Sequence, residues 1–94
     1  MPSILGRFSK QTAEILDYDV DYTDWFVDRG DTPSTHTTTA DAGITVVSSV
    51  RTGKVIKVIL SGGMNGETYK TTLRLTTSSG VVKEADFTVK IKDV

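Results

Sequence analysis

The chain has 94 residues, with 11 basic and 12 acidic side chains and a formal net charge of −1. This length suits one domain with a modest core. The near-neutral charge excludes a general attraction to nucleic acid or to an anionic membrane. Cys is absent, which excludes disulfides and suits assembly in a reducing cytoplasm. No apolar run approaches the about 20 residues that cross a bilayer, so neither a membrane nor a nucleic-acid partner is expected.

The charge is distributed unevenly along the chain. Residues 1–47 carry eight acidic and three basic side chains, whereas residues 48–94 carry four acidic and eight basic ones. Acidic and basic strands that alternate in the fold would neutralise each other, and this is the favoured interpretation. The alternative is docking between copies of the chain, which makes a homo-oligomer possible.

The composition predicts an all-β protein, because fifteen Thr, eleven Val and six Ile are β-branched. Residues 1–10 are expected to be an N-terminal tail or arm. Residues 11–94 are expected to form the folded domain.

The segment 14–22 is predicted to be a strand whose alternate residues are acidic. The side chains of Asp17, Asp19 and Asp21 then share one extended face and form a candidate partner-binding strip. The same spacing invites a calcium-loop interpretation. However, Tyr22 stands where such a loop needs Gly, and Asp28 where it needs a bidentate Glu. No metal site and no cofactor are therefore expected.

One short helical turn is predicted over residues 23–27, with Thr23 or Asp24 as its N-cap. Trp25 and Phe26 are expected to close one end of the core, because the chain has few other large aromatic side chains.

Residues 32–40 are β-prone but polar, which is typical of an edge strand or an ordered loop. His36 and Thr37 are candidate partner-binding residues there, since such an edge can accept a specific strand. His36 is the only His, and Cys is absent, so a zinc site is excluded. No serine lies in a nucleophile-elbow motif.

The segments 44–50 and 54–60 are predicted to be two further strands. Ile44, Val46 and Val50 are expected to point inward from the first. In the second, apolar residues on both faces indicate a central or covered strand. The segment 61–66 contains three Gly and is predicted to be a loop. Gly66 to Tyr69 resembles the corner where a Tyr hydroxyl ties a loop to the sheet in immunoglobulin-like domains.

The clearest pattern is a hairpin of residues 69–77 and 81–91 around Ser78-Ser79-Gly80. Strict alternation places five residues in its core: Leu73, Leu75, Phe87, Val89 and Ile91. About six or seven short strands with regular turns predict a single antiparallel immunoglobulin-like β-sandwich.

The order of motifs resembles phage fiber-tail adaptors, which are small virion proteins of tailed bacteriophages. Three groups of residues carry the resemblance, which spans about residues 10–92: Glu14-x-Leu16-Asp17-Tyr18-x-x-Asp21-Tyr22-x-x-Trp25; Gly30-Asp31-Thr32 with Gly43-Ile44-Thr45-Val46; and Leu60-Ser61-Gly62-Gly63-x-x-Gly66-x-x-Tyr69-x-x-Thr72 with Thr76-Thr77. The resemblance implies an immunoglobulin-like sandwich without enzymatic activity. It also implies that several copies lie where the fibres join the tail. The implied partners are tail, portal-proximal or fibre proteins, and the implied location is a virion assembled in the host cytoplasm.

Two alternatives remain open at this stage. One is a head-decoration or other virion β-sandwich protein. The other is an extracellular calcium- or carbohydrate-binding module, which calcium-dependent melting would favour.

Overall fold

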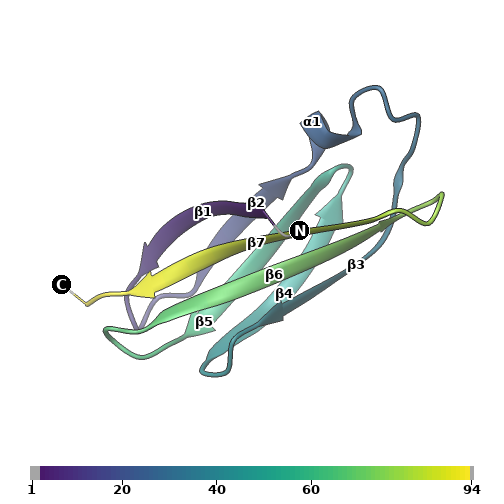
Figure 1. The fold of residues 1–94 in the computed structure, drawn as a ribbon. Helices are drawn as coiled ribbons and strands as arrows, with labels where there is room; N and C mark the ends of the chain where they lie inside the picture. Colours follow the sequence, from purple (N-terminus) through teal and green to yellow (C-terminus); the bar gives the residue numbers. More distant parts are fainter. Residues whose placement is uncertain (1–2, 94) are drawn as a thin grey trace.

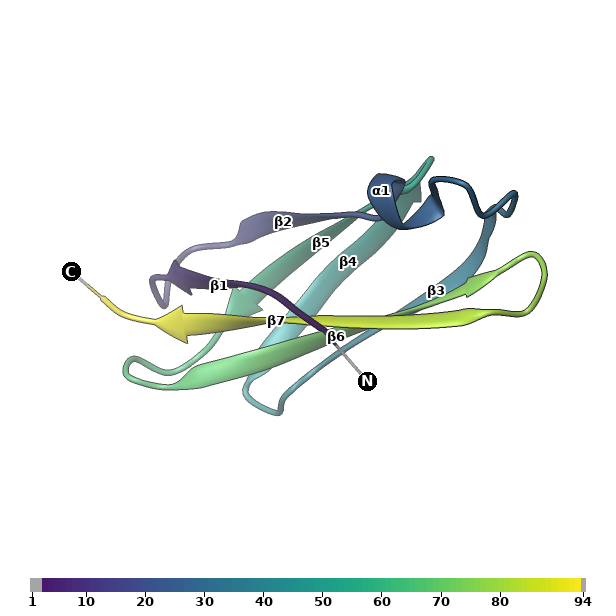
Figure 2. The same ribbon diagram turned by 45° about the horizontal axis from the view of Figure 1, so that its top comes forward.

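A computed structural model describes residues 3–93 of the chain, with side chains from Phe8 onward. It contains two stacked sheets and one short helix (Figures 1 and 2). The elements are β1 (Ser3–Lys10), β2 (Leu16–Asp21), α1 (Thr23–Phe26), β3 (Pro33–Ala40), β4 (Ile44–Thr52), β5 (Val55–Gly62), β6 (Thr68–Thr77) and β7 (Val82–Ile91).

One sheet has the strand order β1-β7-β6-β3 and the other has the order β2-β5-β4. Strands 2, 5 and 4 thus occupy one layer and strands 3, 6 and 7 the other, as in immunoglobulin sandwiches. The predicted all-β sandwich is confirmed. The shape is elongated, with extents of 45 × 22 × 20 Å, and α1 and the C-terminal end of β7 lie toward opposite ends (Figure 1).

The N-terminal segment differs from its prediction. Residues 3–10 were expected to be a tail or arm, but they form β1, which pairs in parallel with β7. The sandwich is therefore antiparallel except for this one pair. Phe8 contributes to the interior, since its ring centroid lies 5.2 Å from that of Tyr18 and 5.7 Å from that of Phe87.

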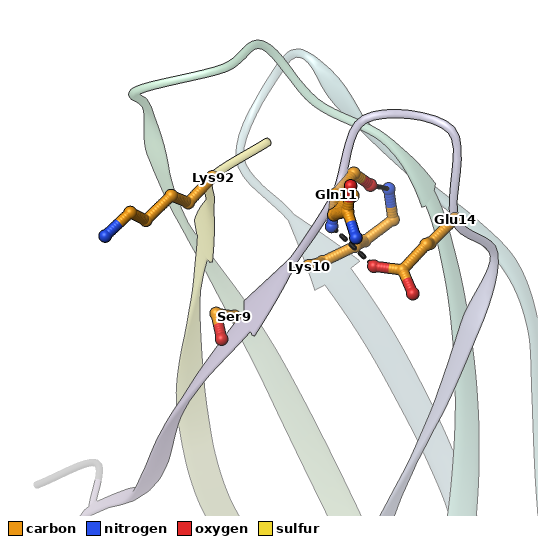
Figure 3. A pocket seen from close by; sticks show the side chains of 5 residues that line it. All are labelled: Ser9, Lys10, Gln11, Glu14 and Lys92. Carbon is orange, nitrogen blue, oxygen red and sulfur yellow. Dashed lines mark hydrogen bonds between the residues drawn. The ribbon is translucent and has the colours of Figure 1, made fainter. Parts of the chain in front are cut away.

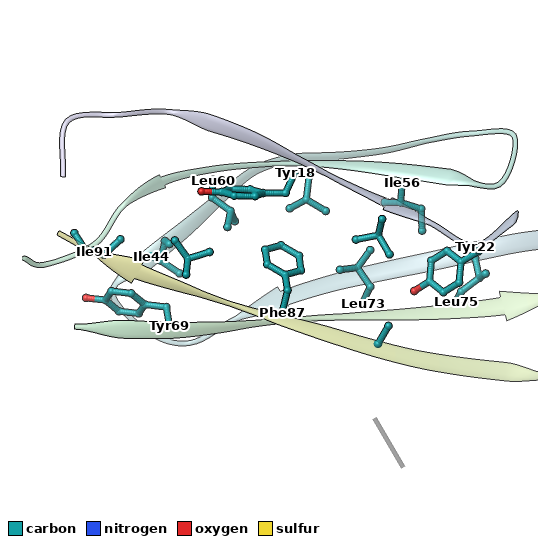
Figure 4. Packing of buried hydrophobic residues seen from close by; sticks show 14 of the residues in the cluster. Tyr18, Tyr22, Ile44, Ile56, Leu60, Tyr69, Leu73, Leu75, Phe87 and Ile91 are labelled. Atoms are coloured by element: carbon teal, nitrogen blue, oxygen red, sulfur yellow. The ribbon is translucent and has the colours of Figure 1, made fainter. Parts of the chain in front are cut away.

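The β6–β7 hairpin lies at the centre of its sheet, as predicted, and its five expected core residues are all buried. They pack against the inward side chains of β2 and β5 (Figure 4). Tyr69 confirms the predicted corner, because its hydroxyl accepts a hydrogen bond of 2.9 Å from the Met64 backbone N–H.

The prediction for β4 is partly wrong. Ile44 is buried and Val46 is half-buried, but Val50 is 58% exposed. A register shift between Val46 and Ser48 inserts one extra residue opposite β5. Because side chains alternate with a period of two, such a bulge moves every later residue to the opposite face.

The helical turn is confirmed over Thr23–Phe26, but its expected cap is not. The Asp21 carboxylate accepts hydrogen bonds from the N–H and hydroxyl of Thr23, whereas Tyr22 occupies the N-cap position without a side-chain bond. Phe26 is buried, while Trp25 is only half-buried, with the Arg29 guanidinium 4.1 Å above its ring.

Candidate protein-docking site

The acidic strip, defined as Asp17, Asp19 and Asp21, lies on β2 as predicted. All three side chains are exposed, while the intervening Tyr18 and Val20 are buried. The strand forces this separation, because successive side chains point to opposite sides of a sheet. Burial of β2 against the core therefore fixes the acidic strip on the outer side of its sheet.

Two members of the acidic strip have partners within the chain. The Asp17 carboxylate lies 3.7 Å from the ammonium of Lys57, and both side chains are largely exposed. The hydrogen bond from the Thr23 hydroxyl, followed by that from the Thr23 N–H, lowers the pKa of Asp21. Asp21 consequently supports α1 as well as contributing charge, which makes Asp17 and Asp19 the better positions for testing a docking role.

His36 and Thr37 lie on β3, in the other sheet, so the fold does not bring them to the acidic strip. His36 is half-buried, and its Nε2 donates to the Ser49 carbonyl oxygen at 3.2 Å. The hydroxyls of Thr38 and Ser49 are 2.7 Å apart and join the same two edges. Thr37 points the other way and is exposed. His36 thus connects strands β3 and β4 through its hydrogen bond. Of the two candidate residues, only Thr37 has a solvent-facing position.

Within residues 3–93, no group of three His, Asp or Glu is arranged to hold a metal ion. The acidic strip lies on an extended strand, where side chains cannot converge on one centre as they do in a turning loop. In the same part of the chain, no helix is long and apolar enough to cross a membrane.

We expect calcium to leave the stability unchanged. Melting curves followed by circular dichroism in millimolar calcium chloride and in excess chelator should superimpose, because the acidic strip is extended rather than looped. A calcium-dependent rise in melting temperature would restore the calcium-module alternative.

A pocket at the end opposite α1 is lined by Ser9, Lys10, Gln11, Glu14 and Lys92 (Figure 3). Only 2% of Lys10 is exposed. Its ammonium donates to the carbonyl oxygens of Gln11 and Gly62 at 2.7 Å and to that of Thr12 at 3.4 Å. An ammonium has three donors, so these carbonyls use them all. Lys10 therefore joins β1, the following loop and β5, and it is a structural cation.

Asp31 ties the loop after α1 to the β6–β7 turn. Its carboxylate accepts hydrogen bonds from the Ser79 hydroxyl and from the Thr32 N–H. The Ser79 hydroxyl, followed by the Thr77 hydroxyl, lowers the pKa of Asp31 to about 2. The ionised form is therefore the one that stabilises this end of the sandwich.

We expect Asp31→Asn to lower the melting temperature at pH 7 and to lower it much less at pH 2. The folded-state pKa of about 2 lies below the ordinary value of about 3.9. The stabilisation is thus complete at pH values above the ordinary pKa, and it is lost as the pH falls through the folded-state pKa. Melting temperatures at pH 7, 4 and 2 test this, with the exposed Glu67→Gln as control. An equal difference in melting temperature between Asp31→Asn and the wild type at all three pH values would contradict stabilisation by the ionised Asp31 carboxylate.

Sequence reasoning missed both Lys10 and Asp31. A lysine at an inward position breaks the apolar alternation that reveals a strand, so residues 3–10 gave no clear signal. Asp31 precedes a β-prone segment, and its partner Ser79 is 48 residues away. Only the folded chain brings these groups together.

The structure is a small all-β sandwich of two sheets with an exposed acidic strip. Residues 10–90 match the family described as "Podophage GP4 fiber-tail adaptor protein gp77", and the chain belongs to this family. The resemblance seen in the sequence is thereby confirmed, and the chain is a structural, tail-associated component of a phage virion. No curated protein sequence matches the chain.

Proposed function

We propose that this protein is a non-enzymatic adaptor that joins the tail of a podophage particle to its fibres. The observation that carries the proposal is the family match over residues 10–90. The protein would act by docking, since the sandwich offers a rigid scaffold whose exposed strands and loops remain accessible to partners.

The partners would be other virion proteins, in the tail, next to the portal or in the fibres. The acidic strip is a candidate contact because three exposed carboxylates are held by a buried strand. Thr37 is a second candidate on the opposite sheet, where its exposed side chain could meet a different partner. His36 is a weaker candidate, because the Ser49 carbonyl already accepts its hydrogen bond.

Particles made by a phage that lacks this gene test the proposal. We expect purified mutant particles to lack fibres and to regain them when the purified protein and purified fibres are added. Quantitative mass spectrometry of the particles measures both effects, and mass photometry of the free protein gives its oligomeric state. Mutant particles with a normal fibre content would contradict the adaptor function.

A further inference from the structure

The outer face of the β2-β5-β4 sheet carries apolar side chains between charged and polar ones. Outward positions of a sandwich strand are normally polar, yet central strand β5 places Val55 and Ile59 there, both half-buried. Strand register places their outward neighbours in three rows, defined here as the outer face: Asp17–Ile59–Ser48, Asp19–Lys57–Val50 and Asp21–Val55–Thr52.

The bulge in β4 adds apolar surface to the outer face. It inserts Val47, which is 54% exposed, and turns Val50 outward with 58% of its surface exposed. Ser49 takes the inward place instead, where its hydroxyl lies 2.7 Å from that of Thr38. The bulge thus exchanges a serine for a valine at the surface, an arrangement that suits burial under a partner.

The charges beside this apolar surface specify the partner's chemistry. The outer face carries the three carboxylates of the acidic strip and the single cation Lys57. Alternate residues of a strand are about 7 Å apart, so the acidic strip matches Lys or Arg side chains at every second position of another strand. Carboxylates at the rim would steer and orient such a partner, while the valines and Ile59 would be buried beneath it.

A second copy of this chain is a poor candidate for that partner. Three described basic side chains on the outer side of the other sheet already have partners in their own chain. Lys70 lies 4.0 Å from Asp86, Arg74 lies 3.0 Å from Glu84, and the Lys90 ammonium donates to the Gly66 carbonyl oxygen. Docking them on the acidic strip would require breaking these contacts.

We infer that the outer face binds a basic, aliphatic β-surface of a different virion protein. Asp17 and Asp19 meet its Lys or Arg side chains, and Val47, Val50 and Ile59 are buried under its aliphatic side chains. The inference rests on the proposed function, because that function is the reason to expect the partner to be a tail or fibre protein.

Binding to separately purified tail and fibre proteins of the same phage tests the inference. The probes are Val50→Lys and Asp19→Lys, both at exposed positions. Their matched controls are Val82→Lys, at a valine 54% exposed on the other sheet, and Glu67→Lys, in an exposed loop. Dissociation constants are measured by biolayer interferometry at low and high salt, and melting temperatures verify folding.

We expect each probe to weaken binding of one partner by about tenfold or more, because each places an added positive charge against the basic side chains of that partner. The controls should bind as the wild type does, and salt should weaken wild-type binding, because exposed charges are screened. Hydrogen exchange of the wild-type complex, which needs no variant, should show protection over residues 47–59. Equal binding by Val50→Lys and Val82→Lys, with no protection there, would overturn the inference and leave the adaptor function intact. Failure of the wild type to bind any tail or fibre protein would overturn both.

Discussion

Replacing Phe87 by Ala should lower the free energy of unfolding by about 3–5 kcal/mol, as is usual for a fully buried phenylalanine. Phe87 is 1% exposed, and its ring centroid lies 5.4 Å from that of Tyr18 in the facing sheet. The loss is a large part of the about 5–15 kcal/mol that stabilises a typical domain. Urea denaturation followed by circular dichroism measures it.

Phe8→Ala is the matched control, since Phe8 belongs to the same aromatic cluster but is 43% exposed. Its loss should be clearly smaller, because less apolar surface leaves water when this side chain packs. Equal losses for the two variants, or cooperative unfolding of Phe87→Ala at the wild-type midpoint, would contradict the hairpin-centred core.

Gly63→Ala should also be strongly destabilising, for two separate reasons. Gly63 has a φ of +97°, which costs a residue with a Cβ about 1–2 kcal/mol. A Cβ there would lie 2.6 Å from Cγ1 of Ile91, a side chain with no exposed surface. Forcing a methyl group into a packed core costs about 1–3 kcal/mol more.

Gly66→Ala separates the two costs, because Gly66 has a nearly equal φ of +93° but no atom within 4 Å of a built Cβ. We expect it to lose only the backbone part, so that Gly63→Ala unfolds at a lower urea concentration. Similar midpoints for both variants would show that Ile91 moves aside without cost.

Local patterns predicted most of the fold. Alternation in residues 69–77 and 81–91 placed Leu73, Leu75 and Phe87 in the core, and all are buried. The polar segment that contains His36 was predicted to be an edge strand or an ordered loop, and it forms β3, the edge of its sheet. These predictions hold because a strand's two faces and its turn chemistry are recorded in neighbouring residues.

The candidate site was predictable only in part. The exposure of Asp17, Asp19 and Asp21 follows from their alternation with Tyr18 and Val20. Their apolar neighbours on β5 and β4 do not follow from any local pattern, because strand register is a long-range property.

The sequence by itself determined the all-β class, the hairpin core, the acidic strip and, through its motifs, the family. The tertiary structure decided the rest: β1 beside β7, the burial of Lys10 and the outward turn of Val50. Each of these depends on groups far apart in the chain. Parallel pairing joins the two ends of the sequence, the Lys10 ammonium needs the Gly62 carbonyl, and the bulge is defined only by the register of β4 against β5.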